Sequence, residues 1–159
     1  MFKKYYLAYG SNLNLTQMNY RCHNAKPIGT TNLEGYRLVY KGRENNFAYL
    51  TIEKCESYSV PLGVFEISSF DIYLLDIYEG YPNLYSKHYI PIKIDNKTKK
   101  ALIYVINDYF EYHFPAKGYI DICTEGYRDF GFDQSILDKA LVDTIDNISS
   151  IKEYKKTQS

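Results

Sequence analysis

The stretch YLAYGSNLNL (residues 6–15) decides how the chain begins to fold, because it joins a strand-like run to the start of a helix. The residues from Lys3 to Tyr9 predict a first strand, and Gly10 ends it. Asn14 is placed to cap a short helix, and Gln17, three residues later, completes a pattern similar to a capping box. The chain therefore begins with a strand, a short loop and a helix.

The loop formed by Gly10, Ser11 and Asn12 is a candidate binding site for an anion. A strand that passes through glycine into a helix N-terminus presents backbone N–H groups that have no acceptor within the helix. Gly10 lets the backbone approach a ligand closely, and Ser11 and Asn12 add short polar side chains. The loop lacks the length and the Gly-Lys-Thr ending of a Walker P-loop, which argues against nucleotide binding. An ordinary strand-to-helix turn explains these residues about as well as a carboxylate site does.

A second stretch, SSFDIYLLDIYEGYP (residues 68–82), changes to the period of a helix. Ser68 or Ser69 can cap this helix at its start, while Gly80 fits its C-terminal end and Pro82 prevents it from continuing. Apolar residues spaced three and four apart then share one face of the helix: Phe70, Leu74, Leu75 and Tyr78.

Glu79 lies in the last turn of this predicted helix, where the helix dipole disfavours a carboxylate by about 0.3–1 kcal/mol. If neighbouring tyrosines also bury it, desolvation raises the pKa of its carboxyl above the reference value of about 4.3. A group that takes and returns a proton near neutral pH needs such a pKa. The alternative is a solvated glutamate in a frayed helix end. Glu125, which also precedes a glycine, is a reserve candidate for the base.

The remaining segments predict more strands than helices. Further strands are expected at residues 36–41, 47–53, 58–67, 85–94 and 100–106, and residues 95–98 predict a hairpin connection between the last two. Further helices are expected at 118–126 and from Asp133 onward. Pro61 and Gly63 suggest a sheet edge or a bulge. Because strands and helices do not alternate regularly, the expected fold is a mixed α+β domain. It is expected to have a curved or barrel-like sheet with surrounding helices over residues 1–149, and a polar C-terminal tail at 150–159.

Composition argues against several kinds of partner. The 159 residues carry a formal net charge of zero, so no basic excess is available for nucleic acid or an anionic membrane. No apolar stretch approaches the roughly 20 residues of a membrane span, and no secretory signal is visible. Three unpaired cysteines, Cys22, Cys55 and Cys123, suit a reduced cytoplasmic protein. The three histidines are too scattered to suggest a metal site.

Several motifs, taken in order, resemble the γ-glutamylcyclotransferase-like superfamily, also called the AIG2-like family. They are YGSNL at residues 9–13, GYRLVY at 35–40, VPLGVFEI at 60–67 and LLDIYEGYPNLY at 74–85, followed by Pro115, Tyr119 and GYRDFGF at 126–132. The spacing Glu-x-x-Pro-x-x-Tyr is similar to that of γ-glutamylamine cyclotransferases and their bacterial relatives. Asp129 stands where many members have glutamate, which leaves open any supporting role at that position.

The resemblance implies a γ-glutamylcyclotransferase-like fold and an enzyme that releases 5-oxoproline from a small γ-glutamyl amine or peptide. No metal or cofactor is implied. The family's catalytic glutamate falls on Glu79. Its substrate-holding residues fall on the loop Tyr9, Gly10, Ser11, Asn12 and Leu13 and on Tyr85.

The chemistry that the residues offer agrees with this implication. The attacking amine and the carbonyl belong to one molecule, so holding a folded-back conformer replaces much of the usual catalytic machinery. A single acid/base side chain can then carry the proton. A non-catalytic module that binds a small molecule or a partner on the same fold is the rival interpretation, because fold does not guarantee activity. The sequence predicts neither the leaving amine nor the oligomeric state.

Overall fold

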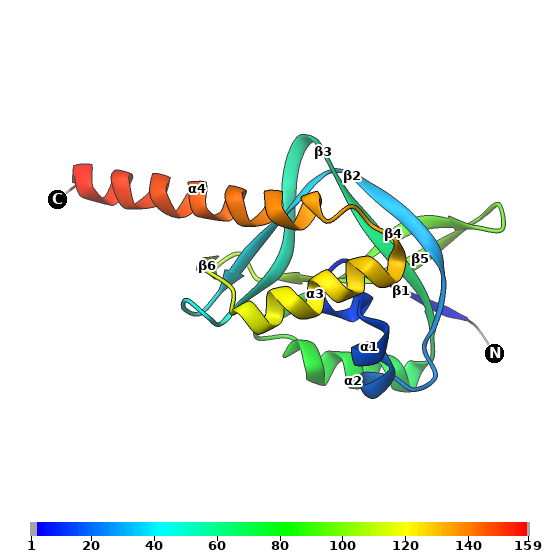
Figure 1. Ribbon diagram of the computed structural model, residues 1–159. Coiled ribbons are helices and arrows are strands. Elements are labelled where there is room, and N and C mark those ends of the chain that lie inside the picture. Colours follow the sequence, from blue (N-terminus) through cyan, green and yellow to red (C-terminus); the bar gives the residue numbers. More distant parts are fainter. Residues whose placement is uncertain (1–2, 159) are drawn as a thin grey trace.

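In the computed structural model, which describes residues 3–158, strand β1 (Lys4–Ala8) lies inside a curled six-stranded sheet (Figure 1). The strand order is β4-β5-β1-β3-β2-β6. β1 pairs in parallel with β5 and antiparallel with β3, and the other neighbouring strands are antiparallel. The sheet is therefore mixed and curved, and four α-helices lie around it, which confirms the predicted α+β fold class.

The other strands are β2 (Lys26–Gly42), β3 (Ala48–Ile67), β4 (Tyr85–Ile94), β5 (Lys97–Ile106) and β6 (Glu111–Tyr112). β4 and β5 form the predicted hairpin. Asp95 and Asn96 make its two-residue turn and both have positive φ, as a tight hairpin turn requires. β6 is too short to have been recognised from a residue pattern.

β3 is one continuous strand, and the prediction of separate strands at 47–53 and 58–67 is wrong. The polar segment between them is absorbed by a register shift against β2, where Gly35 and Ser57 have positive φ. The strand bends there instead of turning back. Pro61 pairs with Asn32 in register, so the predicted bulge at Pro61–Gly63 is also wrong. β1 pairs with β3 only from Gly63 onward, so Pro61 does lie at a local edge.

The α-helices are α1 (Leu15–Arg21), α2 (Ser69–Glu79), α3 (Lys117–Phe130) and α4 (Ser135–Gln158), and a 3-10 turn, η1 (Ser11–Leu13), precedes α1. α1 packs against α2, α3 packs against η1, and α4 packs against β2. Figure 1 shows α1 and α2 together at one end of the sheet, with α3 crossing close to the loop that follows β1. The loop is thus enclosed by helices.

The apolar face expected on α2 is only partly buried, because Leu75 is buried while Phe70 and Tyr78 are exposed. The predicted end of the next helix at Gly126 is wrong. α3 continues past Gly126 and ends before Gly131, which adopts the left-handed conformation of a helix C-cap. Gly126 is buried inside the helix because α3 approaches another backbone there.

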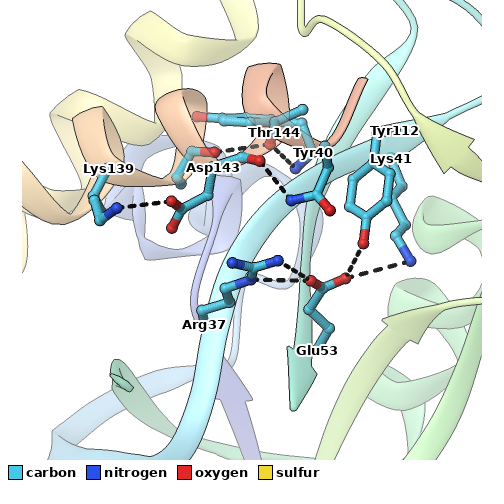
Figure 2. A network of polar contacts seen from close by, with 10 residues as sticks. Arg37, Tyr40, Lys41, Glu53, Tyr112, Lys139, Asp143 and Thr144 are labelled. Carbon is cyan, nitrogen blue, oxygen red and sulfur yellow. Dashed lines mark hydrogen bonds and ion pairs between the residues drawn. The ribbon is translucent and has the colours of Figure 1, made fainter. Parts of the chain in front are cut away.

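Figure 2 shows how α4 is fixed to the sheet. The backbone N–H of Tyr40 in β2 donates to Thr144 Oγ1 at 2.9 Å, and that hydroxyl donates to the carbonyl of Ala140 at 2.8 Å. α4 then continues as a helix through residues 150–158, which are mostly exposed. Across residues 3–158, the structure contains no helix whose length and apolarity would allow it to cross a bilayer.

Candidate active site

The loop after β1 is built as a tight turn that leaves its first N–H groups without an acceptor inside the turn. Gly10 precedes η1, and the N–H groups of Leu13 and Asn14 return to the carbonyls of Gly10 and Ser11 at 3.1 Å. Ser11 and Asn12 are the first two residues of the turn, so their own N–H groups have no acceptor within it. The loop can therefore offer two neighbouring donors to a ligand.

α3 holds this loop from behind. A Cβ on Gly126 would lie 2.5 Å from the backbone nitrogen of Asn14, so only glycine allows this approach. Asn14 caps α1 by accepting from Gln17 N–H, and it donates to Glu125 Oε2 at 3.0 Å. Asp129 accepts from the N–H of Leu15 at 2.9 Å. The fold thus places Glu125 and Asp129 where they support the loop. The sequence had left the supporting role of Asp129 open.

α2 places Glu79 beside the same loop. The helix begins with a capping box between Ser68 and Asp71, and it ends where Gly80 turns left-handed at φ 65°. Glu79 is consequently the last residue of the helix. Its carboxylate oxygen Oε1 accepts from Asn12 Nδ2 at 3.1 Å, although the two residues lie 67 positions apart in the sequence. The two motifs singled out from the sequence therefore meet in space.

A small pocket lies between these elements. Its lining consists of Tyr6, Tyr9, Gly10, Ser11, Asn12, Leu50, Glu79, Tyr85, Tyr104 and Tyr119. The structure therefore brings together every sequence-predicted site residue except Leu13. The Leu13 side chain is fully buried against Gly63, where a Cβ would lie 2.6 Å from Leu13 Cδ2. Leu13 anchors the turn in the core and does not line the pocket.

Burial raises the pKa of the Glu79 carboxyl to about 7. The positive charge of Arg21 and the hydrogen bond from Asn12 act in the opposite direction, but they offset only part of the effect of burial. A carboxyl with this pKa is present in both protonation states near neutral pH. Glu79 can therefore accept a proton and release it again without leaving its position.

The tyrosines around Glu79 are neutral at physiological pH. Burial, followed by the charge of Glu79, raises the pKa of Tyr6, Tyr9 and Tyr85. The hydroxyl of Tyr9 donates to the carbonyl of Tyr104 at 2.6 Å, and that of Tyr85 donates to the carbonyl of Leu50 at 3.0 Å. Their protons are committed to backbone acceptors, so these tyrosines shape the pocket and do not act as its base.

Several pocket residues were missed by the sequence analysis: Tyr6, Leu50, Tyr104, Tyr119 and, beside the pocket, Arg21. The first four lie on three different strands and one helix, so only the folded sheet brings them together. Arg21 had a local signal, because it lies four residues after Gln17 and thus on the same face of α1. Glu125, the reserve candidate for the base, lies outside the pocket lining.

Within residues 3–158, no group of three or more His, Cys, Asp or Glu side chains is arranged to hold a metal ion. A Ser86–His88 contact of 2.9 Å on β4 also has no catalytic arrangement, because the Ser86 hydroxyl donates to the carbonyl of Val105. Glu79 is therefore the acid/base group on which a reaction at this pocket would depend.

Comparisons with known proteins agree with the fold. Residues 6–128 match the profile of a family described as "Gamma-glutamyl cyclotransferase, AIG2-like". A solved structure named "Gamma-glutamyl cyclotransferase" is 19% identical with a TM-score of 0.74, and the match covers 87% of this chain and 86% of that one. An uncharacterized protein from Homo sapiens is 20% identical with a TM-score of 0.73, over 87% and 86% of the two chains. An AIG2-like protein from Mus musculus is 16% identical with a TM-score of 0.53, over 76% and 84%. No match was found among the curated proteins.

Proposed function

The chain belongs to the gamma-glutamyl cyclotransferase, AIG2-like family, and we propose that it releases 5-oxoproline from a γ-glutamyl amine or γ-glutamyl peptide. In this reaction the α-amine of the glutamyl group attacks its own γ-carbonyl and expels the attached amine. Glu79 is the general acid/base. Tyr9, Gly10, Ser11, Asn12 and Tyr85 form the substrate pocket, and Leu13 fixes the loop from the core.

One observation carries this proposal: Glu79 lies in a pocket lined also by Ser11 and Asn12, whose N–H groups have no acceptor within the turn, and a neutral donor holds it there. Asn12 occupies Oε1 at 3.1 Å, and Oε2 has no hydrogen-bond partner among the described residues. The carboxyl has a pKa of about 7 because burial outweighs the nearby charge. A binding module does not require a carboxyl that titrates near neutral pH, whereas general acid–base catalysis needs a group that changes between its two protonation states in that range.

The proposed reaction has a simple proton balance. The substrate α-ammonium gives a proton to Glu79, and the free amine nitrogen forms a bond with the γ-carbonyl carbon. The tetrahedral adduct then loses its bond to the leaving nitrogen, which takes the first proton from Glu79. The ring nitrogen still carries one proton too many, and Glu79 accepts this second proton and passes it to the released amine, which departs as an ammonium. One amide is exchanged for a lactam, so no oxidant or reductant enters. Holding both reacting groups in one folded-back conformer accounts for much of the rate.

The N–H groups of Ser11 and Asn12 are proposed to bind the negative charge of the substrate. Either the α-carboxylate or the oxyanion of the tetrahedral adduct is an acceptor for them, and one oxyanion donor is worth about 2.7–4 kcal/mol of catalysis. The neutral tyrosine hydroxyls line the rest of the pocket. Their rings make the surroundings of Glu79 poorly solvated, which is the cause of its raised pKa.

The test is a panel of γ-glutamyl amines and γ-glutamyl dipeptides, with 5-oxoproline measured by mass spectrometry. We expect at least one substrate to be turned over, and the accepted one identifies the leaving amine. Thermal stabilisation by a γ-glutamyl compound without any 5-oxoproline would instead support the non-catalytic module. The absence of both binding and turnover across the whole panel would contradict the proposal.

A further inference from the structure

Arg21, the last residue of α1, turns its side chain back toward the substrate loop. Its guanidinium nitrogen Nη1 donates to Ser11 Oγ at 3.2 Å and also to Asn12 Oδ1, and Nη2 donates to Gln17 Oε1 at 3.2 Å. The guanidinium carbon lies 3.6 Å from the centre of the Tyr78 ring. Arg21 is thus held by a stacking contact and three acceptors, all of them within or beside the pocket.

These contacts determine which way the Asn12 amide faces. A guanidinium has only donors, so the oxygen of Asn12 must be the atom that faces Arg21. The NH₂ group of Asn12 then points away from Arg21. It donates to the hydroxyl of Tyr6 at 2.8 Å and to Glu79 Oε1 at 3.1 Å. The amide is fully used, with its oxygen and both of its protons engaged, and a rotation by 180° would place its oxygen against the Glu79 carboxyl.

We propose that Arg21 is a positioning residue for the reaction: it fixes the orientation of the Asn12 amide, and through this amide it orients the Glu79 carboxyl toward the substrate. This inference rests on the proposed function for its catalytic meaning, although the orientation of Asn12 and Glu79 can be measured without turnover. Among the described residues, Arg21 makes no direct hydrogen bond with Glu79. Its effect on the orientation of the carboxyl passes through Asn12.

Arg21 also adds a positive charge that keeps the Glu79 pKa from rising further. The other groups that face Glu79 are tyrosines from β1, from the residue that follows it, and from α2, β4 and β5. Burial raises the pKa of each of them, so they stay neutral in the relevant pH range. They are Tyr6, Tyr9, Tyr78, Tyr85 and Tyr104. Removing the positive charge of Arg21 should therefore raise the pKa of Glu79 further, so that a smaller fraction of Glu79 can act as a base at pH 7.

The experiment compares Arg21→Gln with Arg21→Lys. Lysine keeps the charge, but its single ammonium cannot replace the planar fork that holds Ser11, Asn12 and Gln17 together and stacks on Tyr78. For Arg21→Gln we expect kcat to fall about 10- to 100-fold, a part of the 10²–10⁴ that general acid–base catalysis supplies. The acidic limb of the pH–rate profile should also move to higher pH. Arg21→Lys should leave that limb near its wild-type position while kcat still falls, with little change in KM for either variant.

A matched control is Arg43→Gln. Arg43 is exposed and stacks on an aromatic ring, that of Phe110 at 5.9 Å, but it lies outside the pocket. We expect this variant to keep the wild-type kcat and pH profile. If Arg43→Gln changed the pH profile as Arg21→Gln does, the effect would be one of general charge and the proposal would be wrong.

A second readout does not depend on turnover. Titration of the Glu79 side-chain carboxyl by carbon-13 NMR, with Glu79→Gln to assign the signal, gives its pKa directly. We expect a higher pKa in Arg21→Gln than in the wild type, and altered Asn12 amide resonances in both Arg21 variants. Unchanged Glu79 and Asn12 signals in folded Arg21 variants would overturn the inference. A protein without cyclotransferase activity that still shows these shifts would contradict the proposed function and leave the positioning role intact.

Discussion

The molecule holds two partly buried glutamates in opposite ways. Glu53 on β3 is surrounded by donors that carry charge: Arg37 donates to its Oε2 from Nη2 at 2.7 Å and from Nε at 3.0 Å, and Lys41 lies 3.6 Å from Oε1 (Figure 2). Tyr112 adds a hydroxyl donor at 2.8 Å. Glu79 has one neutral donor, the amide of Asn12, and the positive charge of Arg21 acts on it without a direct hydrogen bond.

The difference separates a carboxylate that supports the fold from one that can do chemistry. Burial lowers the pKa of Arg37, but its hydrogen bonds and charge interaction with Glu53 raise it by more, so Arg37 stays charged beside this carboxylate. Around Glu79 burial is the larger influence, and the carboxyl has a pKa of about 7. A carboxylate with matched cationic partners is a structural element, whereas one held in place by a neutral amide remains free to change its protonation state.

The largest effect is expected from Glu79→Gln. Glutamine keeps the shape of the side chain but removes the titratable group, so kcat for 5-oxoproline release should fall by about 10²- to 10⁴-fold. The circular dichroism spectrum should remain that of the wild type. A folded Glu79→Gln variant with wild-type turnover of an accepted substrate would remove Glu79 from the mechanism.

The next effect is the pH dependence of stability. The pKa of Glu79 is about 7 in the folded protein and near 4.5 when solvated, so the fold favours its protonated form. The stability that the fold has with Glu79 protonated is fully present below pH 4.5 and is lost as the pH rises through 7. The loss in unfolding free energy is at most about 3 kcal/mol, since partial exposure of the side chain screens its charge. Wild type should therefore lose stability relative to Glu79→Gln between pH 5 and pH 8. Parallel melting temperatures of the two proteins across this range would show that Glu79 is solvated.

A substitution at Gly126 tests whether the Glu79 pocket depends on the close contact between α3 and the backbone of Leu13 and Asn14. In Gly126→Ala the new methyl group would meet the backbone of Leu13 and Asn14, with a cost of about 1–3 kcal/mol and a displaced substrate loop. Activity should fall along with unfolding stability in urea. The matched control is Gly118→Ala in the same helix, where a Cβ meets nothing within 4 Å. It should keep activity and gain up to about 1 kcal/mol, and a similar loss from both variants would argue against a specific contact.

The smallest effect separates the two glutamates most sharply. Glu53→Gln removes the charged acceptor of Arg37, whose side chain is 19% exposed, and should cost about 1–2 kcal/mol of stability. It should leave kcat unchanged, because the network lies outside the pocket lining. Urea unfolding and 5-oxoproline assays on the same preparation measure both quantities. A loss of kcat comparable to that of Glu79→Gln would end the distinction between the two carboxylates.

The features that could be predicted from the sequence are those encoded by neighbouring residues. Ser68, Asp71 and Gly80 give α2 its start and end locally, and these residues place Glu79 in the last turn. The hairpin at Asp95 and Asn96 was recognisable for the same reason. The loop after β1 was recognised as a site because glycine, small polar residues and a helix cap follow one another in the chain.

The features that were missed depend on distant partners. Gly126 was interpreted as the end of a helix, since only the folded protein shows that it makes room for the loop 112 residues earlier at Asn14. Separate strands were predicted at 47–53 and 58–67, because the register shift that joins them into one strand is set by the distant partner β2. Arg21 differs, because its spacing of four from Gln17 was a local signal, but its contacts with Ser11 and Asn12 exist only once α1 folds back over its own N-terminal loop. The contacts of Gly126 and β3 with distant residues leave no local pattern.

The central claim is tested most directly by a crystal structure with 5-oxoproline bound. The account predicts that the lactam lies between Glu79 and the turn at Ser11 and Asn12, with its ring nitrogen about 2.6–3.2 Å from a Glu79 carboxyl oxygen. Its carboxylate should accept from the N–H groups of that turn. A lactam bound elsewhere on the protein, with the Glu79 carboxyl facing water, would contradict the account.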